Sequence, residues 1–198
     1  MIPLQLIVAF ALLGFSAAVV YFVFVTFLFG AGYEPTYRAA VESMLRLAEV
    51  GPQDTVVDLG AGTGAIVFRA ARVYRARVVG VEIEPLRVLI LRLRRRAGPE
   101  RDRIRIERGN LYRIDLSSAT VVTAFLWTGA MGRLRPKFES ELRPGTRIVS
   151  HVHPVPGWTP TVHDAETDVY LYRWPEAVAV STGDNGTRDR PRPPAPRR

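Results

Sequence analysis

Residues 56–64 read Val-Val-Asp-Leu-Gly-Ala-Gly-Thr-Gly, an apolar segment that ends in an acid and continues into a glycine-rich turn. Residues 65–73 have the apolar periodicity of a helix. The sequence therefore predicts a strand, a tight turn and a helix, a unit that directs a helix N-terminus and several backbone N–H groups toward a ligand. Glycine is needed in such a turn where φ is positive, or where a ligand comes too close for a Cβ atom.

The spacing of these glycines separates two classes of cofactor. Dinucleotide-binding turns follow G-x-G-x-x-G, whereas the glycines here occupy positions 60, 62 and 64, with Asp58 two residues before the first. This pattern resembles the first motif of class I S-adenosylmethionine (SAM) methyltransferases. SAM carries no pyrophosphate, and a carboxylate near the turn suits its cationic methionine part. Taken alone, the motif also fits a Rossmann-like unit whose glycine turn binds no SAM.

The remaining pattern predicts an α/β fold. Strands are expected at residues 77–83, 103–108, 119–126 and 147–150, and a late strand at 169–174 is expected to be an antiparallel edge. Helices are expected from residue 35 to about 48 and from 85 to 97, the latter with Leu86, Leu89, Ile90 and Leu93 facing inward and its arginines mostly outward. Segment 119–126 is nearly all apolar, as a central parallel strand should be. The alternation predicts a Rossmann-like, doubly wound, mainly parallel sheet.

The N-terminus predicts one transmembrane helix before this domain. Residues 2–29 are almost continuously apolar, and no charge precedes Glu34. A bilayer core needs roughly 20 such residues, and the run is too long and lacks the basic start of a cleaved signal peptide. We expect an anchor at 1–31, a catalytic domain at 32–178 and a disordered Pro/Arg-rich tail at 179–198. Arg38 and Arg46 follow the run and place the domain in the cytoplasm by the positive-inside rule.

The charge of the chain indicates an anionic neighbour. The net charge is +8, from 27 basic and 19 acidic residues, and almost every basic residue is arginine. Phospholipid and nucleic acid both match this charge, although genome composition produces the same bias. The chain has no cysteine, which excludes disulfides and thiolate metal sites. The spacing of His151, His153 and His163 does not predict a metal site, so none is expected.

Two polar residues lie near the ends of predicted strands, at positions where a SAM site needs them. Glu82 lies about 18 residues beyond Gly64, close to the position of an acid that binds ribose hydroxyls. Asn110 lies in a turn after the third strand, where its side-chain oxygen can accept from an adenine amine. The alternatives are a solvated strand-end acid for Glu82 and an ordinary turn asparagine for Asn110.

From residue 33 to about residue 174, the chain resembles the small archaeal protein-lysine methyltransferases. It is also similar to their membrane-anchored mitochondrial relatives, which modify the ATP synthase c-subunit and the adenine nucleotide translocase. Besides the glycine motif, the matching segments are residues 33–36 (Tyr-Glu-Pro-Thr), 80–83, 109–111, 119–123, 134–138, 142–151 and 157–160 (Gly-Trp-Thr-Pro). The first and last of these are the most particular to the family.

The resemblance implies a role for each matching position. It implies that the cofactor is held by Tyr33, Pro35, Thr36, Asp58, Gly60, Ala61, Gly62, Gly64, Glu82, Ile83, Asn110 and Leu111. Tyr33, Trp127 and Thr128 are candidates for the lysine channel, with a core position as the alternative for Trp127. The chain departs from the family at Thr63 and Ala65, where aspartate and arginine are usual, and after the fourth strand, where an asparagine is often found.

These patterns predict a membrane-anchored SAM-dependent methyltransferase whose acceptor is a protein lysine. No general base is assigned, because SAM is already an activated methyl donor and desolvation favours the neutral amine. A small-molecule, lipid or RNA methyltransferase and a non-catalytic SAM-binding membrane module are the alternatives. The usual motif for methylating exocyclic base nitrogens is missing after the fourth strand, so a nucleic-acid partner is not expected.

Overall fold

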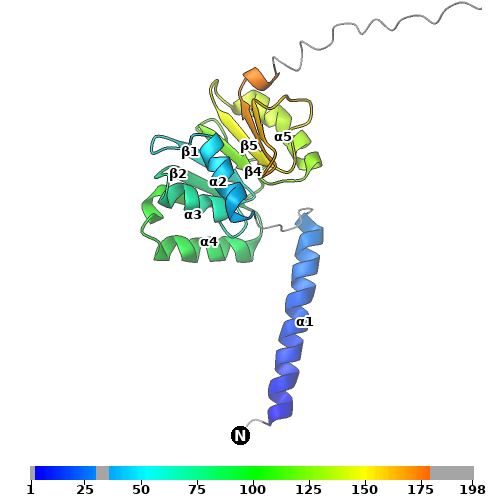
Figure 1. Ribbon diagram of the computed structural model, residues 1–198. Helices are drawn as coiled ribbons and strands as arrows, with labels where there is room; N and C mark the ends of the chain where they lie inside the picture. The colour runs from blue at the N-terminus through cyan, green and yellow to red at the C-terminus, as the bar shows by residue number, and fades with distance from the viewer. Residues whose placement is uncertain (1–2, 30–35, 179–198) are drawn as a thin grey trace, which may run out of the picture.

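The computed structural model describes residues 3–29 and 36–178 (Figure 1). Tyr33 and Pro35, and the tail predicted at 179–198, lie outside the described residues. The side chains of residues 18 and 22–29 are also outside the description. The fold and the site below therefore concern the remaining residues.

Seven strands form one sheet in the order β3-β2-β1-β4-β5-β7-β6. The first five strands are parallel, as the sequence predicts. Their bounds and those of the last two strands are β1 Thr55–Leu59, β2 Arg77–Glu82, β3 Ile104–Arg108, β4 Val121–Ala124, β5 Arg147–His151, β6 Val162–Asp164 and β7 Val169–Arg173. The direction in which the chain crosses the sheet reverses between β1 and β4. In open α/β sheets, ligands bind beyond the carboxyl ends of the strands at such a reversal.

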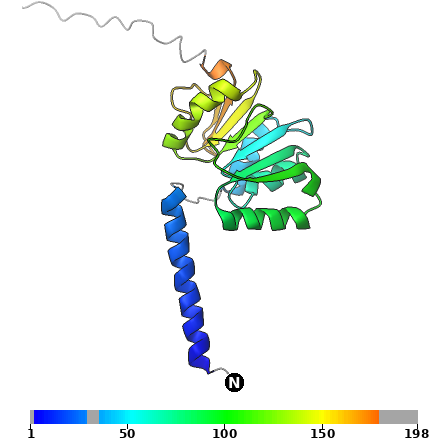
Figure 2. The same ribbon diagram turned by 180° about the vertical axis from the view of Figure 1, so that it is seen from behind.

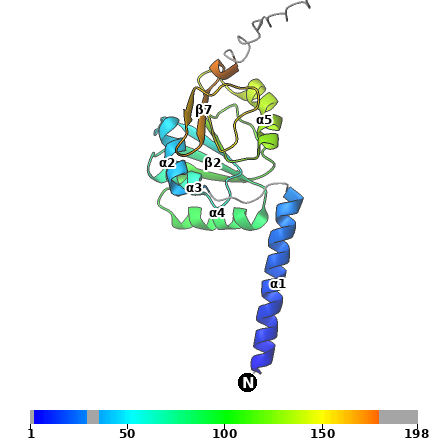
Figure 3. The same ribbon diagram turned by 45° about the vertical axis from the view of Figure 1, so that its right-hand side comes forward.

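Helices cover both faces of the sheet, as Figures 1 and 3 show. On one face lie α2 (Arg38–Leu47), α3 (Ala65–Arg72) and α4 (Pro85–Ala97), and on the other lies α5 (Thr128–Glu141). A short 3-10 helix, Arg101–Arg103, precedes β3. Alternate residues of β1 enter different cores: Val56 packs with α2 and α3, and Val57 packs with the buried residues of α5. This is the burial pattern of a central parallel strand.

Two expectations about element positions are wrong, and one strand was not expected at all. The helix expected from Pro35 begins at Arg38, because Tyr37 before it is extended, with φ −71° and ψ 157°. The strand at Val169–Arg173 is antiparallel, as expected, but it is not the edge: β7 pairs with β5 on one side and with β6 on the other. The outermost strand is β6, whose three residues are too short and too polar to be recognised from the sequence.

The orientation expected for α4 is also wrong. Its buried residues are Val88 and Leu91, whereas Leu86, Leu89 and Leu93 are 48%, 52% and 53% exposed. The expectation failed because the leucines outnumber the two residues that contact the sheet, and a helix with apolar residues on two faces has no clear periodicity.

Helix α1 (Leu4–Phe29) contains no charged residue and extends away from the sheet (Figures 1 and 2). Its described side chains are exposed. Residues Leu4–Tyr21 meet the length and hydropathy expected of a membrane span, by composition alone, and none of them is buried against the domain. A contact with the domain is made by Tyr21, whose hydroxyl donates a hydrogen bond to the Glu84 carboxylate.

Candidate active site

The glycine turn joins β1 to α3 at the carboxyl edge of the sheet. Gly60, Gly62 and Gly64 have φ values of 83°, 55° and 89°, which L side chains rarely adopt. A Cβ atom on Gly64 would also lie 2.6 Å from the Phe68 ring and 2.7 Å from Leu91. Gly60 N and Ala61 N donate to the carbonyl of Val81 at 3.0 and 2.9 Å, so the turn folds back over the end of β2. The expected strand–turn–helix unit is confirmed.

Glu82 ends β2 and is held beside this turn by backbone donors. Its Oε2 accepts from Gly62 N at 2.8 Å, and its Oε1 accepts from Ile83 N at 2.9 Å and from Glu84 N at 3.0 Å. The residue is only 5% exposed. A carboxylate has about four acceptor positions, so Glu82 keeps capacity for one more donor. The solvated strand-end alternative is therefore wrong.

Asp58 is a second buried carboxylate at the same edge, in β1. Its Oδ1 accepts a 2.8 Å hydrogen bond from the Thr123 hydroxyl of β4, its register partner. The pKa of the Asp58 carboxyl is raised from 3.8 to about 7, chiefly because the group is buried; the negative charge of Glu82 also raises the pKa, and the Thr123 hydrogen bond partly offsets both effects. A cationic ligand between these two acids would favour the ionised form of Asp58. We call residues 58–64 and Glu82 the polar half of the site.

The other expected cofactor residues lie near the ends of β2 and β3. Ile83 follows Glu82 and is exposed, so its side chain is available to cover a flat ring. Leu111 packs partly against the α5 core. Asn110 is exposed, and its Oδ1 accepts from Tyr112 N at 2.9 Å, which is an Asx turn. The turn alternative for Asn110 thus describes its contact, and the oxygen has a second lone pair for a ligand.

Aromatic rings and histidines gather at the carboxyl ends of β4 and β5. Phe125 contacts His151 edge to face, with ring centroids 4.4 Å apart. The ring of Tyr37 also meets His151 edge to face, with ring centroids 5.4 Å apart. Trp127 stacks with His153 at 5.5 Å. We call Tyr37, Phe125, Trp127, His151 and His153 the aromatic half of the site. The two halves adjoin, because a Cβ atom on Gly60 would lie 3.2 Å from Leu126, between Phe125 and Trp127.

Trp127 belongs to this aromatic half, and Thr128 adjoins it. Trp127 is 59% exposed, which excludes a core position. Thr128 begins α5, and its Oγ1 lies 3.2 Å from His153 Nδ1. Thr36 is half-buried just before Tyr37, whereas Tyr33 and Pro35 lie outside the described residues. The sequence analysis missed Tyr37 and Phe125, and it considered His151 and His153 only as metal ligands, a role that it did not expect. The alternation of Phe125 with Trp127 beyond β4 was the available signal.

Two other features do not contribute to this edge. Trp158 of the family-like 157–160 segment is buried against Phe138, Tyr172 and Trp174, so its role is structural.

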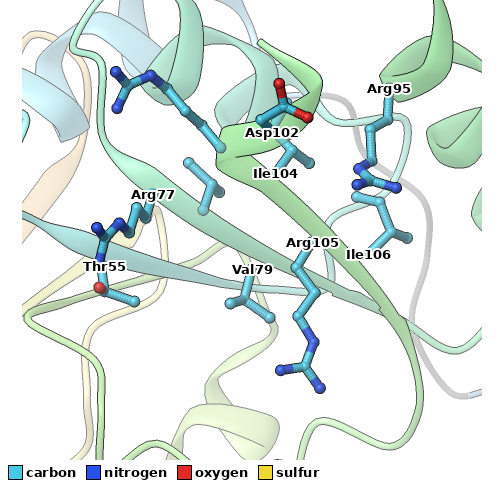
Figure 4. A pocket seen from close by; sticks show the side chains of 10 residues that line it. Thr55, Arg77, Val79, Arg95, Asp102, Ile104, Arg105 and Ile106 are labelled. Carbon is cyan, nitrogen blue, oxygen red and sulfur yellow. The ribbon is translucent and has the colours of Figure 1, made fainter.

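A hollow of about 480 Å³ lies at the opposite, amino ends of β1–β3 (Figure 4), lined by Thr55, Arg77, Val78, Val79, Arg95, Asp102, Arg103, Ile104, Arg105 and Ile106. It contains none of the motif residues. Among the described residues, no three His, Asp or Glu side chains group as a metal site.

Comparison with known proteins identifies the family. The model of the ANTKMT methyltransferase domain matches residues 58–162. The chain is 41% identical to a protein-lysine N-methyltransferase of Saccharolobus islandicus, over 71% of this chain and 91% of that protein. The chain belongs to the ANTKMT methyltransferase family. It is also 34% identical to the mouse adenine nucleotide translocase lysine N-methyltransferase, over 61% of this chain and 52% of that protein.

Among solved structures, an RNA methyltransferase from Salinibacter ruber in complex with S-adenosylhomocysteine (SAH) is similar to this ANTKMT domain. The identity is 41%, the TM-score is 0.70, and the match covers 72% of this chain and 95% of that one. The ANTKMT-type chain is thus a SAM-dependent methyltransferase with a Rossmann-like fold. The residues present fit the cofactor, because a cationic ligand would compensate the two buried carboxylates at the glycine turn.

Proposed function

We propose that this chain is a membrane-anchored methyltransferase that transfers methyl groups from SAM to lysine amines of a protein. The observation that carries the proposal is the 41% identity, over 91% of its length, to a protein-lysine N-methyltransferase. The site supports it with a cation-binding polar half next to an aromatic half. An amine acceptor that enters between exposed rings can be stripped of water before it reacts.

In this proposal, the polar half binds and orients the cofactor. Glu82 accepts from the ribose hydroxyls, Asp58 lies near the cationic methionine part, and Gly60, Ala61, Gly62 and Gly64 leave room for it. Ile83 and Leu111 flank the adenine, and Asn110 accepts from its amine. When bound, SAM supplies an activated methyl group on a sulfonium centre. The chain's contribution is to hold the acceptor in line with that group.

The aromatic half selects and desolvates the acceptor. Lysine reacts as a neutral amine, and burial next to apolar surface lowers a lysine pKa. Phe125, Trp127 and Tyr37 offer ring faces that attract an ammonium group and also exclude water as it loses its proton. Trp127 and Thr128 border the entrance of the lysine channel in this proposal. Tyr33, the third residue expected in the channel, lies outside the described residues. No dedicated base is needed, since the proton of the ammonium can leave to solvent before methyl transfer.

Helix α1 is proposed to anchor the enzyme. Its 26 residues extend about 39 Å at 1.5 Å per residue, which is enough to cross a bilayer core of about 30 Å. The basic residues Arg38 and Arg46 follow the helix, so the methyltransferase domain, residues 32–178, faces the cytoplasm in this proposal.

The test is transfer of a labelled methyl group from SAM by the purified full chain. Membranes, cytosol and RNA of the source organism are offered separately, and the products are hydrolysed to monomers. We expect methyl-lysine in a membrane-fraction protein. A Glu82→Gln chain serves as the cofactor-site control and should leave the same band unlabelled. Label confined to lipid would contradict the acceptor and leave the cofactor site intact.

RNA is the second candidate acceptor. The specific observation in its favour is the 41% identity to the structure described as an RNA methyltransferase, together with the net charge of +8. Label recovered in a methylated nucleoside, sensitive to ribonuclease and insensitive to protease, would replace the lysine proposal with this one. Binding of SAH without label in any fraction would indicate a non-catalytic SAM-binding module.

A further inference from the structure

Helix α4 exposes an apolar surface on the side opposite the sheet. Its inward contacts are made by Val88 and Leu91. The three leucines Leu86, Leu89 and Leu93, three and four residues apart, form one stripe, and each is about half exposed. Half-buried Ile90 borders it. A helix with apolar residues on both faces buries one face within its own domain, and a contiguous apolar stripe on the other face favours contact with an apolar partner.

Arginines border this leucine stripe. The helix contains five arginines and no acid. Three of them make intramolecular contacts: Arg94 lies over the Phe68 ring, Arg95 donates to the Arg101 carbonyl and Arg87 lies 3.9 Å from Glu84. Arg92 and Arg96 are exposed and form no salt bridge within residues 3–29 and 36–178. Leucines flanked by uncompensated arginines have the chemistry of a helix that lies in an anionic lipid interface.

The position of α4 relative to α1 specifies what could cover the stripe. Tyr21 is the last residue of the candidate span Leu4–Tyr21, and its hydroxyl contacts Glu84, the N-cap of α4. Tyrosine is enriched at the level of lipid headgroups. Figures 1 and 3 show α4 lying crosswise to α1 near its C-terminal end. A helix crosswise to a spanning helix, at headgroup level, is parallel to the membrane plane.

We propose that α4 is a second, interfacial membrane contact: Leu86, Leu89 and Leu93 insert among the lipids, while Arg92 and Arg96 bind anionic headgroups of the same leaflet. This proposal rests on the anchoring by α1 and not on the identity of the acceptor. It brings the carboxyl edge of the sheet close to the bilayer surface, because α4 begins three residues after Glu82. The enzyme would therefore present its site to acceptors near that surface.

Because the chain contains no cysteine, single labels can test this contact in the full chain. Leu89→Cys, Leu12→Cys and Ser140→Cys chains are labelled with an environment-sensitive fluorophore and reconstituted in vesicles with or without phosphatidylglycerol. Leu12 reports on α1, and Ser140 is an exposed position on α5. Quenching by nitroxide lipids and by aqueous iodide is compared, and SAH binding checks that each chain is folded.

We expect nitroxide lipids to quench the labels at positions 89 and 12, and iodide to quench the label at position 140. At position 89, lipid quenching should be stronger in vesicles with phosphatidylglycerol than in vesicles without it. Adding Arg92→Gln and Arg96→Gln should reduce lipid quenching at 89 to its level without phosphatidylglycerol. The charge-matched pair Arg113→Gln and Arg143→Gln should not. If 12 is quenched by lipid while 89 is as accessible to iodide as 140, the α4 proposal is wrong and the anchor stands.

Two further outcomes overturn the proposal. If neither 12 nor 89 is reached by nitroxide lipids, anchoring fails and the α4 contact fails with it, whereas the methyl-transfer assay still decides the acceptor. If 89 is shielded from iodide in vesicles and in lipid-free detergent alike, and is not quenched by nitroxide lipids, the stripe is covered by protein, such as a second copy of the chain.

Discussion

The polar and aromatic halves of the site differ in how their parts are connected. The polar half is built from one continuous turn and one strand end, and its geometry depends on backbone donors and positive φ values. The aromatic half is assembled from three separate segments: the loop before α2, the end of β4 and the end of β5. The polar half depends on local backbone geometry, which suits a cofactor that is the same in every methyltransferase of this class. The aromatic half depends on the tertiary fold, so its residues can differ between enzymes with different acceptors.

The largest expected effect concerns the electrostatics of the polar half. Because the folded-state pKa of Asp58 is raised from 3.8 to about 7, its contribution to stability is present at low pH and is lost as pH rises through about 7. The loss amounts to up to about 4 kcal/mol. An Asp58→Asn chain should lack this loss, so the excess of its free energy of unfolding over that of the wild type, without ligand, should grow from pH 4 to about pH 7 and then level off.

Denaturant titrations of both chains in detergent, across that pH range, measure this difference. SAH should restore part of the wild-type stability at high pH, because its ammonium group favours the ionised carboxylate. If the free energies of unfolding of the two chains depend on pH in the same way, Asp58 ionises with an ordinary pKa and the polar half does not favour a cation through this carboxyl.

The next effect separates cofactor binding from acceptor binding. Glu82→Ala removes an acceptor for ribose hydroxyls, and hydrogen bonds to a charged group contribute about 1.5–3 kcal/mol each. SAH affinity measured by calorimetry should fall roughly 100-fold. Glu107→Ala, on the adjoining strand β3, is the matched control and should bind SAH normally. Equal affinities for all three chains would remove Glu82 from the site.

A smaller effect tests whether the turn requires glycine. Gly64→Ala places a Cβ atom against Phe68 and Leu91 at a φ of 89°, and strain plus overpacking should lower stability by about 2–3 kcal/mol. Gly129→Ala, in the first turn of α5, has open space around its Cβ position and should be neutral or slightly stabilising. A lower unfolding midpoint for Gly64→Ala, with no loss for Gly129→Ala, would show that the polar turn requires glycine; equal midpoints would show that it does not.

The smallest effect belongs to the aromatic half. Trp127→Ala should raise the KM for a lysine acceptor about 10-fold, since a partly exposed aromatic contact contributes about 1–1.5 kcal/mol. SAH affinity should remain unchanged, and Trp127→Phe should recover most of the loss. A drop in SAH affinity with an unchanged KM would assign Trp127 to the cofactor instead.

The sequence predicted the polar half better than the aromatic half for a physical reason. Asp58, the three glycines and Glu82 are specified by short-range backbone geometry, which leaves a fixed spacing in the sequence. The contact between Tyr37 and His151 joins residues far apart in the chain, and no periodicity marks it. Helix α4 was located to the residue, but its rotation about its own axis was not, because Val88 and Leu91 are outnumbered by outward leucines.

The junction between β2 and α4 links two processes that are otherwise separate. Glu82 and Glu84 are linked by a hydrogen bond, because the Glu82 carboxylate accepts from Glu84 N. The Glu84 carboxylate in turn accepts from Leu86 N, Arg87 N and the Tyr21 hydroxyl. Bilayer contact that stabilises the start of α4 should therefore also stabilise the position of the Glu82 carboxylate, which is proposed to bind ribose, so membrane binding and cofactor binding are coupled. Linkage is reciprocal: a membrane composition that tightens cofactor binding is one to which the cofactor-loaded enzyme binds more tightly.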